Sequence, residues 1–282
     1  MASPTQVFGP PPAVEMHPAR DLIGSMGVGA RHKRSLWPRE HGAYFQLLVP
    51  LVTSLVLVPI TPAAGLLAVA ACCGFLANEP LLVVLGHRGR RLREQDGSRA
   101  ARQLALLASL TAVAGTAGLW LAPHALEIAA IVAVPTAITI GLAWRRLERS
   151  LAGEILAAIT LSGASAAVLV AAGSSAEAAL QVWGAWGIGY ACTVIAAHRV
   201  LARHRKPATW HDTVAALVLA ATTMAGVALL ARGWLVGAST PLALTSLVVV
   251  LRAPSAKYMR TVGFVFAIAS VVTGTLAFIE LR

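Results

Sequence analysis

The sequence of 282 residues is poor in charged residues, in aromatic residues and in cysteine. Charged residues make up 12% of it, whereas a soluble domain carries roughly 25%. Hydrophobic residues reach 57%, and few of them are aromatic. This composition excludes an ordinary soluble domain and indicates a protein that folds in a lipid bilayer.

Missing motifs exclude several classes of site. Cys72, Cys73 and Cys192 lie in apolar segments without a CxxC pair, so neither a disulfide framework nor a zinc site is predicted. No Walker loop, dinucleotide-binding glycine pattern, HExxH or GxSxG motif occurs, and DxxxD and NDxxD runs are absent. We therefore expect no metal and no cofactor.

Nine segments are long and apolar enough to cross a membrane as helices, which takes about 20 residues each. Because backbone groups in lipid must be satisfied within the fold, we expect an all-α, polytopic transmembrane helical bundle forming a single domain over residues 36–282. Residues 1–35 are polar and proline-rich and lack the apolar core of a signal peptide, so we expect a disordered cytoplasmic tail. The nine segments are 43–59, 63–85, 102–121, 124–143, 151–172, 179–198, 212–231, 234–251 and 260–280.

Positive charge alternates along the chain. Twenty-one of the 23 Lys and Arg residues lie before the first segment, in every second gap between segments, or at the first position of the segment after such a gap. The positive-inside rule then places the N-terminus in the cytoplasm and the C-terminus outside. The net charge of +11 is thus dispersed over short loops, and the chain offers no basic soluble domain that would bind nucleic acid.

The first candidate functional residues precede the first helix. The run from Trp37 to Tyr44 contains Arg39, Glu40 and His41, followed by a glycine. Trp and Tyr are common at membrane interfaces, so one interpretation is an anchor. A cation, an acid and an imidazole beside a glycine also suit a binding site, because histidine changes its charge near neutral pH.

Further candidates lie near the predicted cytoplasmic ends of the helices. Asn78 and Glu79 lie inside segment 63–85, where an unpaired acid costs several kcal/mol, so Glu79 has either a function or an arginine partner in the next loop. Glu154 and Asp212 begin their segments, where the helix dipole and capping are the structural alternatives. We expect His41, Glu79 and Glu154 to face one cavity open to the cytoplasm. Other residues at this end could line the same cavity: Asn78, Arg88, Arg90, Arg91, His198, Arg199 and Asp212.

The run Pro38-Arg39-Glu40-His41-Gly42-Ala43-Tyr44 resembles the N-terminal signature of YwiC-like bacterial membrane proteins. Residues 154–158, 190–199 and 254–263 are similar to further parts of that family, so the resemblance covers most of 37–280. It implies a multi-pass protein of the bacterial cytoplasmic membrane and no particular reaction.

The predicted topology also has a distant likeness to the UbiA prenyltransferase superfamily, which implies a prenyl diphosphate bound through Mg²⁺ by aspartate-rich motifs after helices 2 and 6. This sequence has Asn78, Glu79 and then arginines at the first position, and His198 and Arg199 at the second. Mg²⁺ prefers carboxylate oxygens, whereas arginine binds phosphate directly. We therefore expect an anion site that does not depend on Mg²⁺.

Three functions remain open for a chain whose first partner is the lipid bilayer. One is a UbiA-like intramembrane site that binds an anionic lipid or an isoprenoid phosphate, with or without a transferase activity. The others are a permease for small solutes or ions and a structural or assembly protein. Charged residues gathered on one side of the membrane favour the first, because a permease needs a polar pathway through both halves.

Overall fold

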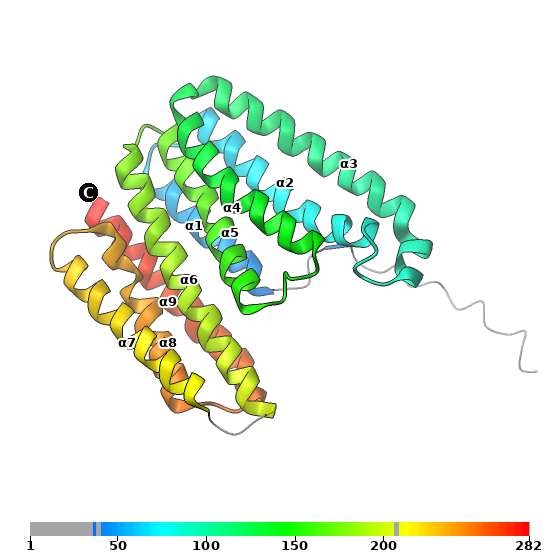
Figure 1. Ribbon diagram of the computed structural model, residues 1–282. Coiled ribbons are helices and arrows are strands. Elements are labelled where there is room, and N and C mark those ends of the chain that lie inside the picture. The colour runs from blue at the N-terminus through cyan, green and yellow to red at the C-terminus, as the bar shows by residue number, and fades with distance from the viewer. Residues whose placement is uncertain (1–35, 38–40, 206–208, 282) are drawn as a thin grey trace, which may run out of the picture. The chain divides into compact units, whose positions relative to one another are not determined.

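The computed structural model describes residues 36–37, 41–205 and 209–281, which form nine α-helices and no β-strand (Figure 1). The predicted all-α fold is confirmed, while the expected tail, residues 1–35, lies outside the described ranges. The helices are α1 (His41–Leu57), α2 (Pro62–Val84), α3 (Arg90–Leu121), α4 (Leu126–Trp144), α5 (Leu151–Ala171), α6 (Ala176–Arg205), α7 (Trp210–Leu230), α8 (Thr240–Arg252) and α9 (Met259–Leu281).

Two helices are longer than their apolar segments. α3 begins at Arg90 instead of residue 102, and α6 continues to Arg205 instead of ending at residue 198. Both extensions are rich in arginine, which is a good helix former in water. Arg90 also donates a hydrogen bond to Glu94 one turn later, at 2.8 Å. A count of apolar residues does not detect such polar helical turns.

The region before α8 departs from the predicted helix 234–251. Residues Leu235–Ser239 form a 3-10 helix, and α8 begins only at Thr240. A Cβ atom added to Gly237 would lie 2.3 Å from the backbone nitrogen of Leu230, so only glycine fits this close contact with the end of α7. The turn therefore replaces the first part of the predicted helix.

Eight helical stretches among the described residues are long and apolar enough to cross a membrane. The eighth helix, α8, reaches the required length only together with the 3-10 turn before it, as Leu235–Arg252. The remaining helix, α1, has 17 residues and a length of about 25 Å, at the short end of the usual range. Large apolar side chains are exposed on the peripheral helices, such as Val113 on α3, Val134 on α4 and Met224 on α7. This surface suits lipid, and the chain is a multi-pass membrane protein in a bilayer.

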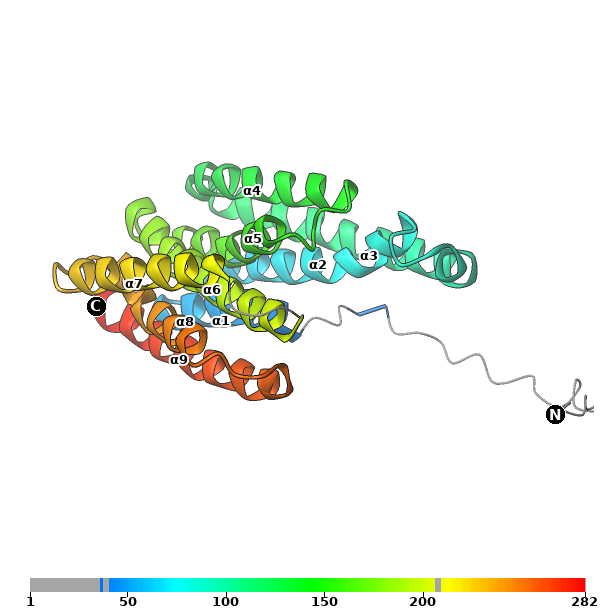
Figure 2. The same ribbon diagram turned by 60° about the horizontal axis from the view of Figure 1, so that its bottom comes forward.

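Helix α5 lies inside the bundle and contacts α1, α2, α4 and α6 (Figures 1 and 2). Its buried positions are mostly small, including Ala158, Ser162 and Ala166. A Cβ atom at Gly163 would lie 3.0 Å from Val132 of α4 and 3.1 Å from Trp183 of α6. Small residues therefore allow α5 to approach its neighbours closely.

The C-terminal ends of α2, α4, α6 and α8 lie at the same end of the bundle, toward the lower right of Figure 1. The basic regions of the sequence are located there, and we call it the basic end. The connections α1–α2, α3–α4, α5–α6 and α7–α8 lie at the opposite end.

Candidate functional site

A cavity of about 360 Å³ lies at the basic end between α1, α2, α4 and α5. Its charged side chains lie near that end, and the lining farther into the bundle is uncharged and mostly apolar. The polar side chains are Gln46, Asn78, Glu79, Arg88, Thr139, Glu148, Arg149 and Glu154. The apolar ones farther in include Phe75, Leu161 and Val194.

Glu79 is the one acidic residue of α2, and it is 5% exposed. Arg88 donates a hydrogen bond from Nη2 to Oε2 of this carboxylate, and about a quarter of its side chain is exposed. The sequence left a functional acid and a structural pair open, and the structure shows the pair. The arginine offsets the cost of an acid within the membrane, and both side chains still line the cavity.

The turn after α2 positions Arg88. The amide of Gly86 donates to the carbonyl of Val83 at 3.0 Å, and the amide of His87 donates to that of Leu82 at 2.9 Å. This is a Schellman motif, which needs a left-handed residue, and Gly86 has a φ of +78°. The chain therefore reverses at once, and Arg88 reaches back to Glu79.

A second charged cluster joins α6, α7 and α8. The Oδ1 atom of Asp212 accepts a hydrogen bond from Arg199 Nε at 2.8 Å and lies 3.1 Å from Arg203 Nε. The Oδ2 atom accepts from the amide of Thr209 at 2.9 Å, as part of a capping box. Arg203 also donates to the carbonyl of Val250, at 2.9 Å. The cluster links the ends of α6, α7 and α8, and none of its residues lines the cavity.

The structure thus divides the predicted candidates into groups. Four of them line the cavity together: Asn78, Glu79, Arg88 and Glu154. Arg199 and Asp212 pair with each other elsewhere, and His198 is half-buried on α6 without lining the cavity. The ends of α2 and α6, which the likeness to UbiA would combine in one site, carry separate clusters.

The remaining candidates, apart from Tyr44, lie at the edge of the bundle or beyond the described residues. Arg90 and Arg91 are exposed and do not line the cavity. Arg39 and Glu40 fall outside the described ranges, and of His41 only the backbone is described. Its neighbour Gly42 does line the cavity.

Sequence reasoning missed some cavity residues. Glu148 and Arg149 follow α4 and were not candidates, because they lie in a short loop that is hydrophilic in any topology. Gln46 lies one turn after Gly42, on the same face of α1. That spacing of four residues could have identified Gln46 from the sequence.

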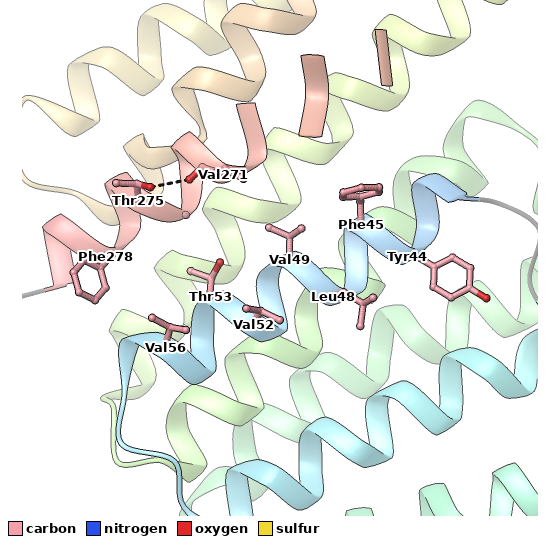
Figure 3. Close-up of a pocket in the computed structure, with 11 residues that line it drawn as sticks. Tyr44, Phe45, Leu48, Val49, Val52, Thr53, Val56, Val271, Thr275 and Phe278 are labelled. Atoms are coloured by element: carbon pink, nitrogen blue, oxygen red, sulfur yellow. Dashed lines mark hydrogen bonds between the residues drawn. The ribbon is translucent and has the colours of Figure 1, made fainter. Parts of the chain in front are cut away.

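An apolar groove of about 540 Å³ lies between α1 and α9 (Figure 3). Tyr44 lies at one end of it, with its ring edge-on to Phe75 at 4.9 Å. The hydroxyl of Thr275 donates to the carbonyl of Val271 within α9, at 3.0 Å. No charged side chain lines the groove among the described residues, so it suits hydrocarbon without selecting a head group.

Most residues that line the cavity belong to the N-terminal part of the chain. The similarity to a known family lies in the same part. Residues 37–169 match the family of YwiC-like proteins. The resemblance predicted from the sequence is confirmed over this range. Every lining residue of the cavity except Val194 belongs to the YwiC-like region. The similarity that we predicted for 190–199 and 254–263 lies beyond the match. No curated protein and no solved structure matches the chain.

Proposed function

We propose that this YwiC-like membrane protein binds an anionic, amphipathic lipid in the cavity between α1, α2, α4 and α5. An isoprenoid phosphate belongs to this class. The observation that carries the proposal is the change of the lining from charged to apolar with depth. A ligand with a charged head and a hydrocarbon chain complements both parts, because binding pockets combine apolar walls with a few polar groups that orient the ligand.

The dimensions agree with such a ligand. Glu154 and Leu161 both line the cavity and are seven residues apart on α5, which corresponds to about 10 Å along the helix. Phe75 likewise lies one turn deeper than Glu79 on α2. The deepest lining residues carry no charge, and most of them are apolar. They therefore favour a ligand whose hydrocarbon chain stays in the membrane over a polar solute that crosses it.

Arginine supplies the attraction for the head group. Arg88 and Arg149 line the cavity, and a guanidinium binds phosphate oxygens through two parallel hydrogen bonds. Glu79 and Glu154 lie within α2 and α5, whereas Arg149 lies in the loop before α5, so the anionic group is expected nearer the bundle end. This arrangement needs no Mg²⁺.

The basic end should face the cytoplasm. Positive-inside topology requires it, because nearly all Lys and Arg residues in the described ranges lie at that end. In a bacterial host, alkaline phosphatase fused after Arg282 should therefore be active, and the same enzyme fused after Gly89 inactive. An active Gly89 fusion together with an inactive C-terminal fusion would show that the orientation is the opposite one.

Filling the cavity should expel the lipid without harming the fold. A Cβ atom at Gly42 meets no heavy atom of the described residues within 4 Å, and Gly42 lines the cavity. We expect Gly42→Leu to reduce co-purifying anionic lipid at least fivefold in native mass spectrometry. The α4 residue Gly141 is also free of contacts within 4 Å but lies outside the cavity, so Gly141→Leu should leave the lipid unchanged.

Both substitutions replace a helical glycine by leucine, which favours the helix by up to about 1 kcal/mol. Thermal unfolding should show that neither variant is less stable than the parent. Equal lipid content in the parent and in the folded Gly42→Leu variant would contradict a lipid site in this cavity.

A further inference from the structure

A second pocket, of about 340 Å³, adjoins the cavity, and almost all the side chains that line it are ionisable. It lies between the turn after α2 and the turn after α4. Its lining consists of Leu82, His87, Arg88, Arg146, Glu148 and Arg149. Three arginines face a single acid, so the pocket attracts an anion. Leu82, Arg88, Glu148 and Arg149 also line the cavity, which makes the two spaces neighbours.

Three polar atoms of this pocket are buried and have no hydrogen-bond partner among the described residues: His87 Nδ1, Arg88 Nε and Glu148 Oε2. They come from both turns. Arg88 uses Nη2 to bind Glu79, so its Nε donor remains available. Buried polar groups are nearly always satisfied, and a cluster of unsatisfied ones at one pocket is what a polar ligand or ordered water would complete.

The backbone at Arg146 gives an independent observation. α4 ends in a Schellman motif, in which the amide of Arg146 donates to Ala143 at 3.0 Å and that of Leu147 to Leu142 at 2.9 Å. The left-handed position is held by Arg146, with a φ of +60°, whereas glycine holds it after α2 and α5. A side chain is strained there, so the turn alone would be better served by glycine. The strained residue is also one that lines the pocket.

We infer that this pocket binds the phosphate group of a phosphate monoester, through Arg88 Nε, Arg146 and Arg149. A carboxylate repels a fully deprotonated anion, but a monoester that keeps one proton can donate it in a hydrogen bond to Glu148 Oε2. Phosphate monoesters lose their second proton near pH 6, so the protonated form is available close to neutral pH. Phosphodiesters and sulfate lack that proton and should bind less well.

This inference deepens the proposed function and rests on it for the lipid chain, which would continue from the pocket into the cavity. The phosphate chemistry is shared by a lipid monoester and by free inorganic phosphate, and the test separates them. Calorimetry on the full-length protein in detergent would titrate inorganic phosphate and, in parallel, sulfate. Native mass spectrometry would compare phosphatidic acid, a monoester, with phosphatidylglycerol, a diester.

Arg146→Gly should weaken the binding of inorganic phosphate and of phosphatidic acid at least tenfold, and its melting temperature should equal or exceed that of the parent. Arg145→Ala is the matched control, because Arg145 is exposed, carries the same charge and does not line the pocket. It should bind like the parent. Glu148→Gln should remove the preference for phosphate over sulfate and for phosphatidic acid over phosphatidylglycerol.

Phosphate binding by Arg146→Gly that equals the parent's would overturn the pocket assignment. Unchanged selectivity in Glu148→Gln would overturn the monoester assignment. The Gly42→Leu variant separates the two proposals, because it fills the cavity and leaves the pocket intact. If it loses phosphatidic acid and retains inorganic phosphate, both proposals hold. If the parent binds inorganic phosphate but no lipid, the pocket stands and the proposed lipid function fails.

Discussion

Replacing Asp212 with alanine should lower the free energy of unfolding by roughly 3–5 kcal/mol, because it leaves buried charges without their partner. Asp212 is 4% exposed. Its carboxylate forms ion pairs with Arg199 and Arg203 and accepts a hydrogen bond from the amide of Thr209. The side chains of the two arginines are 17% and 24% exposed, so water cannot solvate them fully when the acid is gone. The ends of α6 and α7 should then separate before the rest of the bundle unfolds.

Thermal or chemical unfolding in detergent measures this effect, and the chain contains a matched control. Glu94 also pairs with an arginine, Arg90, but their side chains are 62% and 92% exposed. Exposed pairs of this kind contribute about 0.3–0.5 kcal/mol. Glu94→Ala should therefore unfold close to the parent. If Asp212→Ala and Glu94→Ala unfold at the same temperature, the buried ion pairs of Asp212 contribute no more to stability than an exposed pair does.

The second large effect concerns the pair that lines the cavity. Glu79→Leu should also cost roughly 3–5 kcal/mol, because it removes the carboxylate from a mostly buried Arg88 guanidinium. Replacing both partners removes the unpaired charge, and apolar substitutes for a buried ion pair are often neutral or stabilising. The double variant Glu79→Leu with Arg88→Leu should thus recover most of the lost stability.

A double-mutant cycle of the parent, the two single variants and the double variant measures this coupling by unfolding. Strong coupling is the expected outcome, since each single variant leaves one charge unpaired. A double variant as unstable as Glu79→Leu would mean that Glu79 stabilises the fold by contacts other than Arg88. The same double variant should lose the anionic lipid, because it removes an arginine from the site.

The helices were predictable because a membrane helix is a local structure. It satisfies its own backbone hydrogen bonds and needs a fixed length of apolar sequence. The segments 63–85 and 151–172 accordingly agree with α2 (Pro62–Val84) and α5 (Leu151–Ala171) to within one residue at each end. The predicted helix ends are wrong where apolar length does not determine them. These places are the polar first turns of α3 and the close contact of Gly237 before α8.

The site was predictable only in part. The sequence identified Glu79 and Glu154 as acids near the same membrane face, and depth alone suggested a shared cavity. It did not indicate that Asp212, at a similar depth, would pair with Arg199 in another cluster. Nor did it indicate that Arg146 would adopt a left-handed conformation, since this depends on how the end of α4 meets α5.

The sequence by itself determined the membrane class, the order of the helices, and the end of the bundle that carries the charge. Hydrophobicity and charge act on each segment separately, so they can be evaluated without knowing its neighbours. Only the tertiary structure decided which helix ends are adjacent. α5 lies against α1, α2, α4 and α6 because small residues such as Gly163 permit close contact there, which is a property of pairs of surfaces. That packing brings the turns after α2 and α4 together and forms the cavity.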